Sequence, residues 1–341
     1  MGLFSLFSFT QEIAIDLGTA NVLIMHNNNV VVDQPSIVAI DQNTGKMIAL
    51  GSQARLMEGR APDNIKTIRP LRNGVIANFD AAEQMLRGMI KLVNPSKWYT
   101  PSLKMVVCIP SGSTEVEIRA VRDSSEHAGG RDVYMIYEPM AAAIGIGVDV
   151  TAPEGAMIID IGGGTSEIAV IALGGIVYKR SITDAGDVFT ADVQDYMRQE
   201  HNIRLGDRTA EEIKIQVGAV LENLEDPPQP YEVNGPNLMS GLPIKVPVSY
   251  QEIAHCLDKS IGRLESAILD VLEHTPPELY ADIVKHGIFL TGGGALLRGL
   301  DKRLTNRFGI AFTVSDDPLH AVARGTGIAL NNIEKFSFLM R

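Results

Sequence analysis

Two segments of the chain share a pattern in which an apolar run leads to an aspartate and then to a glycine turn closed by a hydroxyl residue. The first covers residues 13–19 (IAIDLGT) and the second covers residues 157–165 (MIIDIGGGT). Each predicts a strand that ends in a tight hairpin, because glycine turns with positive φ and leaves the backbone amides open to an anion. Asp16 and Asp160 are expected where the strands end, and one or two carboxylates suit a hydrated Mg²⁺. The repeat indicates a nucleotide whose polyphosphate is held by two similar domains.

A single copy of this pattern would mean little, since apolar runs followed by Asp, Gly and Thr occur by chance in many β-hairpins. The second copy lies far along the chain, and a third glycine turn follows at residues 290–295 (LTGGGA). The presence of three such turns favours a nucleotide-binding site over a chance occurrence of the pattern.

The composition sets the class of protein. At 341 residues the chain is long enough for two domains of ordinary size, and its net charge of −11 argues against binding nucleic acid. Its two cysteines, Cys108 and Cys256, exclude a disulfide framework and favour a reducing cytoplasm. No apolar stretch reaches the roughly 20 residues of a membrane-spanning helix. Residues 1–9 are apolar and uncharged, which suits either a membrane-dipping anchor or a segment packed on the domain surface.

The elements around these turns alternate between strand and helix, which predicts an α/β fold. We expect capping boxes at Thr114 with Glu117 and at Ser249 with Glu252, and Asp80 as the cap of a further helix. Apolar residues recur at helical spacing after Ser249, which predicts a long amphipathic helix that ends before Pro276.

Six segments, taken in order, are similar to one known family. They are 16–21 (DLGTAN), 110–117 (PSGSTEVE), 138–145 (EPMAAAIG), 160–165 (DIGGGT), 290–297 (LTGGGALL) and 322–325 (VARG). The chain resembles the bacterial actins of the MreB family, within the superfamily of actin, Hsp70 and hexokinase. The similarity covers nearly the whole chain, from Glu12 to Leu330.

The resemblance implies an actin-like ATPase fold with two related ribonuclease H-like domains. Each domain would carry an inserted small subdomain, and the nucleotide would lie in the cleft between the domains. The implied boundaries are 1–32, 79–148 and 318–341 for subdomain IA, 33–78 for IB, 149–183 and 247–317 for IIA, and 184–246 for IIB.

The resemblance also implies a set of nucleotide-binding residues. Asp16 and Asp160 would hold Mg²⁺ largely through water, while Glu211 and Lys214 would border the ribose and adenine. Taken alone, Glu211 and Lys214 are equally an ordinary solvated ion pair one helical turn apart. The phosphate hairpins would be formed by Gly18, Thr19, Ala20 and Asn21 and by Gly162, Gly163, Gly164, Thr165 and Ser166, and the adenosine side of the pocket by Gly292, Gly293, Gly294, Ala295 and Leu296.

Glu138 is the expected catalytic residue, because a carboxylate in the cleft can orient a water molecule in line with the γ-phosphoryl group. Thr165 would help to position that water through its hydroxyl. The alternative for Glu138 is an acid that stabilises a helix N-terminus through the dipole. Tyr137 stands where many family members have Glu, and Ser166 stands where a second Thr is common, which leaves the hydrolysis rate open.

For function, the resemblance implies a slow ATPase that binds ATP/ADP and Mg²⁺ and whose activity is coupled to polymerisation. Subunits would stack head to tail into protofilaments that pair antiparallel on the inner face of the cytoplasmic membrane. There they would organise cell-wall synthesis and maintain rod shape with RodZ, MreC and MreD. Trp98 and Tyr99 in one loop and the apolar N-terminus are the candidate membrane contacts, although Trp98 would pack equally well on its own domain.

Two alternatives on the same fold stay open at this point. A small-molecule kinase needs an aspartate base that faces a sugar pocket, and no aspartate in the chain stands out for that role. A chaperone-type ATPase needs a separate peptide-binding domain, which the sequence after Leu330 is too short to supply.

Overall fold

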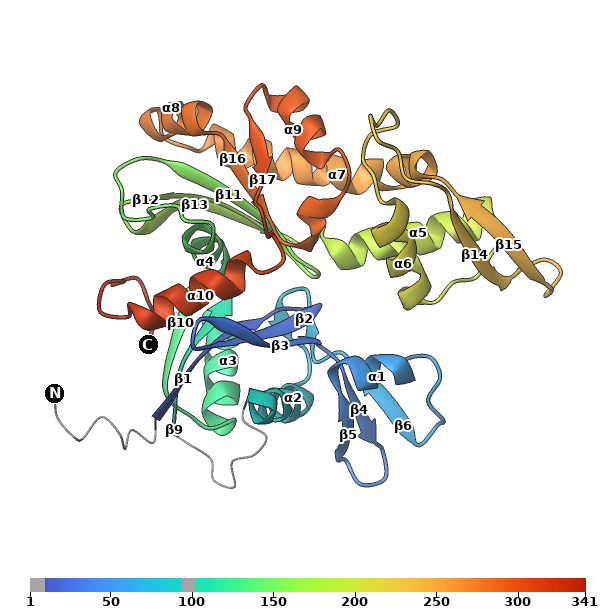
Figure 1. Ribbon diagram of the computed structural model, residues 1–341, viewed down its shortest axis with the longest axis horizontal. Coiled ribbons are helices and arrows are strands. Elements are labelled where there is room, and N and C mark those ends of the chain that lie inside the picture. The colour runs from blue at the N-terminus through green and yellow to red at the C-terminus, as the bar shows by residue number, and fades with distance from the viewer. Residues whose placement is uncertain (1–9, 94–101) are drawn as a thin grey trace. The chain divides into compact units, whose positions relative to one another are not determined.

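The computed structural model describes residues 10–93 and 102–341, and its chain divides into two compact units (Figure 1). The first unit runs to Pro153 and includes Ile171–Ile176 and Leu319–Arg341, and the second comprises Glu154–Val170 and Val177–Pro318. Each unit contains its own large buried apolar cluster. Division into two units agrees with the expected domain count, while the finer division into four subdomains stays a prediction.

A five-stranded sheet organises the first unit. Its strands, in spatial order, are β10 (Gly130–Tyr137), β9 (Ser102–Ile109), β1 (Thr10–Leu17), β2 (Asn21–His26) and β3 (Asn29–Pro35). The strand β1 pairs antiparallel with β2 through the expected hairpin and parallel with β9 on its other side. The strand that carries Asp16 is therefore central, with a hairpin at its carboxyl end.

A second five-stranded sheet, most of which belongs to the second unit, has the same plan. Its strands, in spatial order, are β13 (Gly175–Ile182), β12 (Ser166–Ala172), β11 (Ala156–Ile161), β16 (Ile288–Thr291) and β17 (Phe312–Val314). Here β11 carries Asp160 and pairs parallel with β16, as β1 pairs with β9. The duplicated sequence pattern thus corresponds to a duplicated sheet topology, and the predicted α/β class is confirmed.

Helices supply the apolar faces that bury these sheets. In the first unit α2 (Phe79–Val93) contributes Met85, Leu86 and Met89 to the core, each at most 1% exposed. In the second unit α7 (Tyr250–Glu273) buries six stripe residues completely, as its spacing predicts. Those six are Ile253, Leu257, Ile261, Leu264, Ile268 and Val271.

The remaining elements extend each unit (Figure 1). In the first unit they are β4 (Val38–Asp41), β5 (Met47–Leu50), α1 (Gly51–Met57), β6 (Ile65–Ile68), β7 (Leu71–Arg72), β8 (Val75–Ile76), α3 (Glu115–His127), α4 (Glu138–Gly145) and α10 (Ala321–Asn331). In the second unit they are α5 (Gly186–Glu200), α6 (Asp207–Val217), β14 (Tyr231–Pro236), β15 (Pro243–Val248), α8 (Pro277–His286), the 3₁₀ turn η2 (Gly293–Leu296) and α9 (Leu300–Phe308).

The helix starts confirm two of the three expected caps. Both capping boxes form, with the Thr114 and Ser249 hydroxyls accepting from the amides of Glu117 and Glu252. The expectation for Asp80 is wrong, because the side chain of Asn78 accepts from the amide of Ala81 at 2.9 Å. Asp80 lies inside the first turn of α2, where its charge favours the helix dipole. Asn and Asp cap equally well, so residue type alone could not separate the two positions.

The tightest helix contact lies in the first unit, where α4 and α10 cross at two glycines. A Cβ added to Gly145 would lie 1.8 Å from the carbonyl oxygen of Ala321, and one added to Gly325 would lie 1.7 Å from that of Ala141. Only glycine permits this approach, and it fixes α4, the helix that begins at Glu138, against α10.

Candidate nucleotide and magnesium site

The first hairpin, between β1 and β2, is tied down by residues that follow it in the chain. The Ser36 hydroxyl donates to the carbonyl oxygen of Gly18 at 2.5 Å, and the Ser36 amide donates to that of Ala20 at 2.9 Å. The Thr19 hydroxyl oxygen accepts from the amide of Gly74 at 3.0 Å. These bonds occupy carbonyls and a hydroxyl of the turn, so an anion would be bound by its backbone amides.

Gly18 and Asn21 define the narrowest point of this turn. A Cβ on Gly18 would lie 2.7 Å from the carbonyl oxygen of Asn21, so a side chain there would open the hairpin. Ala20 and Asn21 are exposed, whereas Thr19 is buried. The structure thus brings all four predicted residues of the first hairpin together at the end of β1.

The second hairpin, between β11 and β12, closes through a bond from the Gly162 amide to the carbonyl oxygen of Thr165 at 2.9 Å. The first amides of α5 then donate to the hairpin: Gly186 to the carbonyl oxygen of Gly162 at 3.0 Å, and Asp187 to that of Gly163 at 2.7 Å. The hairpin is therefore packed on the N-terminus of α5, an arrangement that places an electropositive helix end beneath it.

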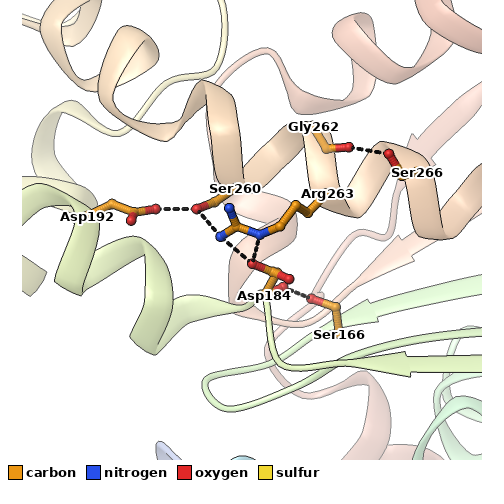
Figure 2. A network of polar contacts seen from close by, with 7 residues as sticks. All are labelled: Ser166, Asp184, Asp192, Ser260, Gly262, Arg263 and Ser266. Carbon is orange, nitrogen blue, oxygen red and sulfur yellow. Dashed lines mark hydrogen bonds and ion pairs between the residues drawn. The ribbon is translucent and has the colours of Figure 1, made fainter.

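Ser166 has a structural role in this hairpin. Its side chain is fully buried, and its hydroxyl donates to the carbonyl oxygen of Asp184 at 2.6 Å. Figure 2 shows that the Asp184 carboxylate in turn accepts from Nε of Arg263 on α7, at 2.5 Å. The Ser166 hydroxyl therefore ties the start of β12 to the loop before α5.

The network continues from Arg263 to α5 (Figure 2). Nη2 of Arg263 donates to the Ser260 hydroxyl at 2.9 Å, and that hydroxyl donates to the carboxylate of Asp192. A charged network of this kind joins α7, α5 and the loop before α5, so the loop that supports the second hairpin is fixed from two helices.

Each strand-end aspartate is held by the neighbouring parallel strand. Asp16 faces Cys108 of β9 in register, and Sγ of Cys108 donates to Oδ1 of Asp16 at 3.0 Å. Asp160 faces Thr291 of β16 in register, and Oγ1 of Thr291 donates to Oδ1 of Asp160 at 2.8 Å. The two aspartates thus occupy equivalent positions in the two sheets.

Burial makes the charged form of Asp16 less favourable in the folded protein. Loss of hydration raises the pKa of Asp16 from 3.8 to about 6, against the lowering effects of the Cys108 hydrogen bond and of His320. A cation near this carboxylate would lower the pKa of Asp16 again and favour its charged form. A single carboxylate at a strand end suits Mg²⁺ better than a metal that needs an all-protein cage, because Mg²⁺ keeps most of its waters. Among residues 10–93 and 102–341, no group of three or more His, Cys, Asp or Glu forms such a cage.

Glu138 lies at the start of α4 and is 9% exposed. Pro139 follows it in the first turn, as the sequence predicts. The charge of Glu138 contributes to raising the pKa of Cys108, after burial and the charge of Asp16, so the carboxylate lies within electrostatic reach of the β9 end. The structure brings Asp16, Cys108 and Glu138 together in the first unit. Thr165, 8% exposed, belongs to the second, and the joint catalytic role of Glu138 and Thr165 stays a prediction.

Glu211 and Lys214 form an ion pair on α6, with Nζ of Lys214 at 2.6 Å from Oε2 of Glu211. The pair is anchored rather than merely solvated. Nζ of Lys214 also donates to the carbonyl oxygen of Gly186 at 2.8 Å, and the Thr190 hydroxyl donates to Glu211 at 2.6 Å. Lys214 therefore reaches the α5 end that supports the second hairpin. The sequence analysis did not predict roles for Gly186 and Thr190. The only feature that could have indicated them is the presence of a glycine and a threonine at the start of a helix.

The third glycine turn packs on the end of β11. Gly292 has φ of +79°, and a Cβ there would lie 2.4 Å from the carbonyl oxygen of Ile161. A Cβ on Gly294 would lie 2.2 Å from Cγ2 of Ile161. Ala295 is buried, and Leu296 is 54% exposed, so this turn presents an apolar side chain to solvent. The structure thus brings residues 292–296 next to the second hairpin, within the second unit.

Some predicted residues cannot be compared with the structure. Trp98, Tyr99 and the apolar N-terminal residues 1–9 lie outside the described residues. Within the described ranges, no helix has the length and hydropathy of a membrane span.

Comparisons with known proteins agree over nearly the whole chain. A family model described as MreB/Mbl protein matches residues 10–338. The chain is 43% identical over 328 residues to the cell shape-determining protein Mbl of Bacillus subtilis (strain 168), covering 96% of this chain and 98% of Mbl. It is 44% identical over 331 residues to the cell shape-determining protein MreB of Escherichia coli (strain K12), covering 96% of this chain and 95% of that protein.

Solved structures show the same similarity in three dimensions. A crystal structure of MreB5 of Spiroplasma citri bound to AMPPNP superposes with a TM-score of 0.90 at 36% identity, covering 96% of this chain and 97% of MreB5. A MamK double helical filament structure is similar in fold, with a TM-score of 0.78 at 20% identity, covering 95% of this chain and 99% of MamK.

Proposed function

Because the chain belongs to the MreB/Mbl family, we propose that it binds ATP with Mg²⁺ and polymerises into filaments that act in cell-shape determination. Membership in the family is accompanied by the actin-like ATPase fold that the sequence predicts. It favours a shape-determining protein over the kinase and chaperone alternatives.

One observation carries the nucleotide-binding part of the proposal: the second hairpin is built on the N-terminus of α5. Its carbonyls accept from Gly186 and Asp187, so the glycine turn lies at the electropositive end of that helix, where an anion is favoured. The relative MreB5 of Spiroplasma citri has been crystallised bound to AMPPNP and to ADP. We infer that residues 18–21 and 162–166 bind the phosphates of one nucleotide, and that Lys214, Glu211 and residues 292–296 border its adenosine part.

Asp16 and Asp160 would hold the Mg²⁺ largely through its water molecules. When bound, the ion neutralises charge on the phosphate oxygens. The chain's own contribution is to keep two carboxylates fixed at the strand ends, so that few atoms must reorganise when the nucleotide binds.

Glu138 is the proposed catalytic residue for hydrolysis. Its carboxylate would accept a hydrogen bond from the attacking water and direct the water's lone pair toward the γ-phosphorus. Thr165 would fix the same water through its hydroxyl. A role for Glu138 in the dipole of α4 is compatible with this one, because only the chemical role depends on the carboxylate's ability to accept a proton.

Polymerisation would follow from head-to-tail stacking, a heterologous contact that does not close on itself. We further propose that ATP favours the polymer and that slow hydrolysis accompanies assembly. The proposal also includes the arrangement that the family resemblance implies. The filaments would pair antiparallel on the inner face of the cytoplasmic membrane and act in cell-wall synthesis with RodZ, MreC and MreD.

Electron microscopy of the purified protein on lipid monolayers tests this function. We expect paired filaments with ATP and Mg²⁺ and a bare monolayer without nucleotide. Trp98→Ser and a deletion of residues 2–9 separate the two candidate membrane contacts, since only the variant that lacks the main contact would form filaments in solution that no longer bind lipid, and unchanged lipid binding by both variants would remove both candidates. A bare monolayer in every condition, together with no pelleting by sedimentation, would contradict polymerisation by the chain alone.

A further inference from the structure

Each strand-end aspartate accepts a hydrogen bond from the side chain directly opposite it on the next parallel strand. The pairs are Asp16 with Cys108 and Asp160 with Thr291, at 3.0 Å and 2.8 Å. The accepting oxygen is Oδ1 in both pairs, and the donating strand holds the same place in both sheets. Since the two strands that donate are unlike in sequence, the shared feature is the donor itself.

We propose that Cys108 and Thr291 are positioning residues, which orient the carboxylates of Asp16 and Asp160 toward the water shell of Mg²⁺; this inference rests on the proposed function.

Both donor side chains are buried, so contact with water does not explain why they are polar. Thr291 is fully buried and Cys108 is 2% exposed. Thr291 is the last residue of β16 and Cys108 the last but one of β9, and the other buried residues of both strands are apolar. Valine would fill either position without a polar group to satisfy. A buried polar side chain is retained where it has a partner, and the partner here is the carboxylate.

The chemistry of both side chains makes them donors to a charged acceptor. The Cys108 side chain carries one S–H group, and Sγ donates to Oδ1 of Asp16 at 3.0 Å. The Thr291 hydroxyl has two acceptors in reach, the carbonyl oxygen of Ile159 at 3.4 Å and Oδ1 of Asp160 at 2.8 Å. The nearer acceptor is the carboxylate oxygen, and the shorter distance favours it.

A donor on Oδ1 restricts rotation of the carboxylate group and sets the direction of its second oxygen. Groups of this kind beside metal ligands change metal affinity by about 10- to 100-fold when removed. A thiol is a weaker donor than a hydroxyl, so Thr291 should hold Asp160 more firmly than Cys108 holds Asp16.

The test compares variants that differ only in the donor: Thr291→Ser with Thr291→Val, and Cys108→Ser with Cys108→Ala. The measured quantity is the ratio of the ATP dissociation constants in EDTA and in Mg²⁺. We expect Thr291→Val to reduce this ratio about tenfold, and Cys108→Ala to reduce it by a smaller factor, about threefold. Both serine variants should stay within about twofold of the wild type, because they retain a donor.

A structural role would alter the melting temperature of the nucleotide-free protein and leave the ratio unchanged, so both are measured. Equal ratios for Thr291→Val and Thr291→Ser, in a protein whose wild type shows a Mg²⁺ effect, would overturn the inference alone. A wild type that binds ATP equally in EDTA and Mg²⁺ would overturn the proposed function instead. The S–H stretching band of Cys108, assigned from Cys108→Ser, tests the contact without nucleotide: it should move to higher frequency in Asp16→Asn, and an unchanged band would overturn the pairing.

Discussion

The first and second sheets share a strand order, yet the hairpins that end their central strands are held differently. The first hairpin is supported by residues of loops and turns: Ser36 donates two hydrogen bonds, from its hydroxyl and its amide, and Gly74 donates a third. The second hairpin is supported by the amides of α5 and by a charged network that Arg263 extends from α7. The same contrast holds at the aspartates, where a thiol faces Asp16 and a hydroxyl faces Asp160.

The difference suggests that the two units have different roles, one mainly in binding the nucleotide and the other in hydrolysis. The second hairpin is bonded to the N-terminus of α5 and linked to the Arg263 network, and the electropositive helix end suits binding of the phosphates. The first hairpin is held by loop and turn residues, with no helix end bonded to it among the contacts described above, and it lies in the unit with Glu138, the proposed catalytic carboxylate. Variants placed in pairs, one in each unit, can therefore separate binding from hydrolysis.

The largest expected effect is on hydrolysis, from Glu138→Gln in the first unit. We expect the rate of phosphate release to fall by about 10²- to 10⁴-fold, because the amide cannot accept the water's proton. The dissociation constant for ATP, set mainly by the hairpins, should change little. Single-turnover phosphate release and ATP binding measure the two quantities, and wild-type release by the variant would remove Glu138 from the mechanism.

The second prediction contrasts two helical glycines. Gly325→Ala places a Cβ 1.7 Å from a carbonyl oxygen of α4, so we expect a loss of about 3 kcal/mol in the free energy of unfolding. Gly262→Ala on α7 meets nothing within 4 Å and should gain about 0.5–1 kcal/mol from helix propensity. Urea unfolding of both variants gives the comparison. Equal effects would show that the crossing of α4 and α10 is looser than described.

The third prediction concerns Asp16 without nucleotide or metal. A pKa raised from 3.8 to about 6 means that the stability due to this group is present at low pH and is lost as the pH rises toward neutrality, by at most about 3 kcal/mol. Asp16→Asn cannot ionise and still accepts from Cys108. In EDTA it should therefore be more stable than the wild type at pH 7.5, and this advantage should shrink at pH 4.5. An advantage that is independent of pH would contradict the account of Asp16.

The smallest expected effect comes from removing one hydrogen bond that supports each hairpin. Ser36→Ala and Ser166→Ala each remove one hydroxyl donor to a backbone carbonyl, which costs about 1–2 kcal/mol. Because the second hairpin keeps its bonds from α5, ATP affinity should fall more in Ser36→Ala than in Ser166→Ala. Differential scanning calorimetry measures the loss of stability, and titration with ATP measures the affinity. A larger loss of affinity in Ser166→Ala than in Ser36→Ala would contradict the proposed difference between the hairpins.

Local features were predictable from the sequence because each depends on residues close together in the chain. The two hairpins, both capping boxes and the α7 stripe follow from glycine conformations, cap chemistry and helical periodicity. The cap of α2 was misplaced by two residues, because Asn78 and Asp80 are chemically equivalent caps. Short-range rules give the elements and leave their exact limits open.

Long-range pairings could not be predicted, because no local rule specifies strand register or helix crossing. Cys108 was expected only inside an apolar strand, and Thr291 only as the residue before a glycine turn. Their contacts with Asp16 and Asp160 depend on which strands pair and in which register. Likewise, the approach of Gly145 to Ala321 joins segments from opposite ends of the first unit's chain. The repeated aspartate pattern identified the sites, and the fold supplied their partners.

The central claim is that the two equivalent strand ends serve one nucleotide, and binding stoichiometry tests it most directly. Isothermal titration of the wild type with ATP in Mg²⁺ should give one site per chain. Asp16→Asn and Asp160→Asn should each weaken that one site, and the double variant should be less impaired than the two single effects combined, as expected for groups that act on a shared ion. Two sites per chain, of which each variant removes one, would contradict the account.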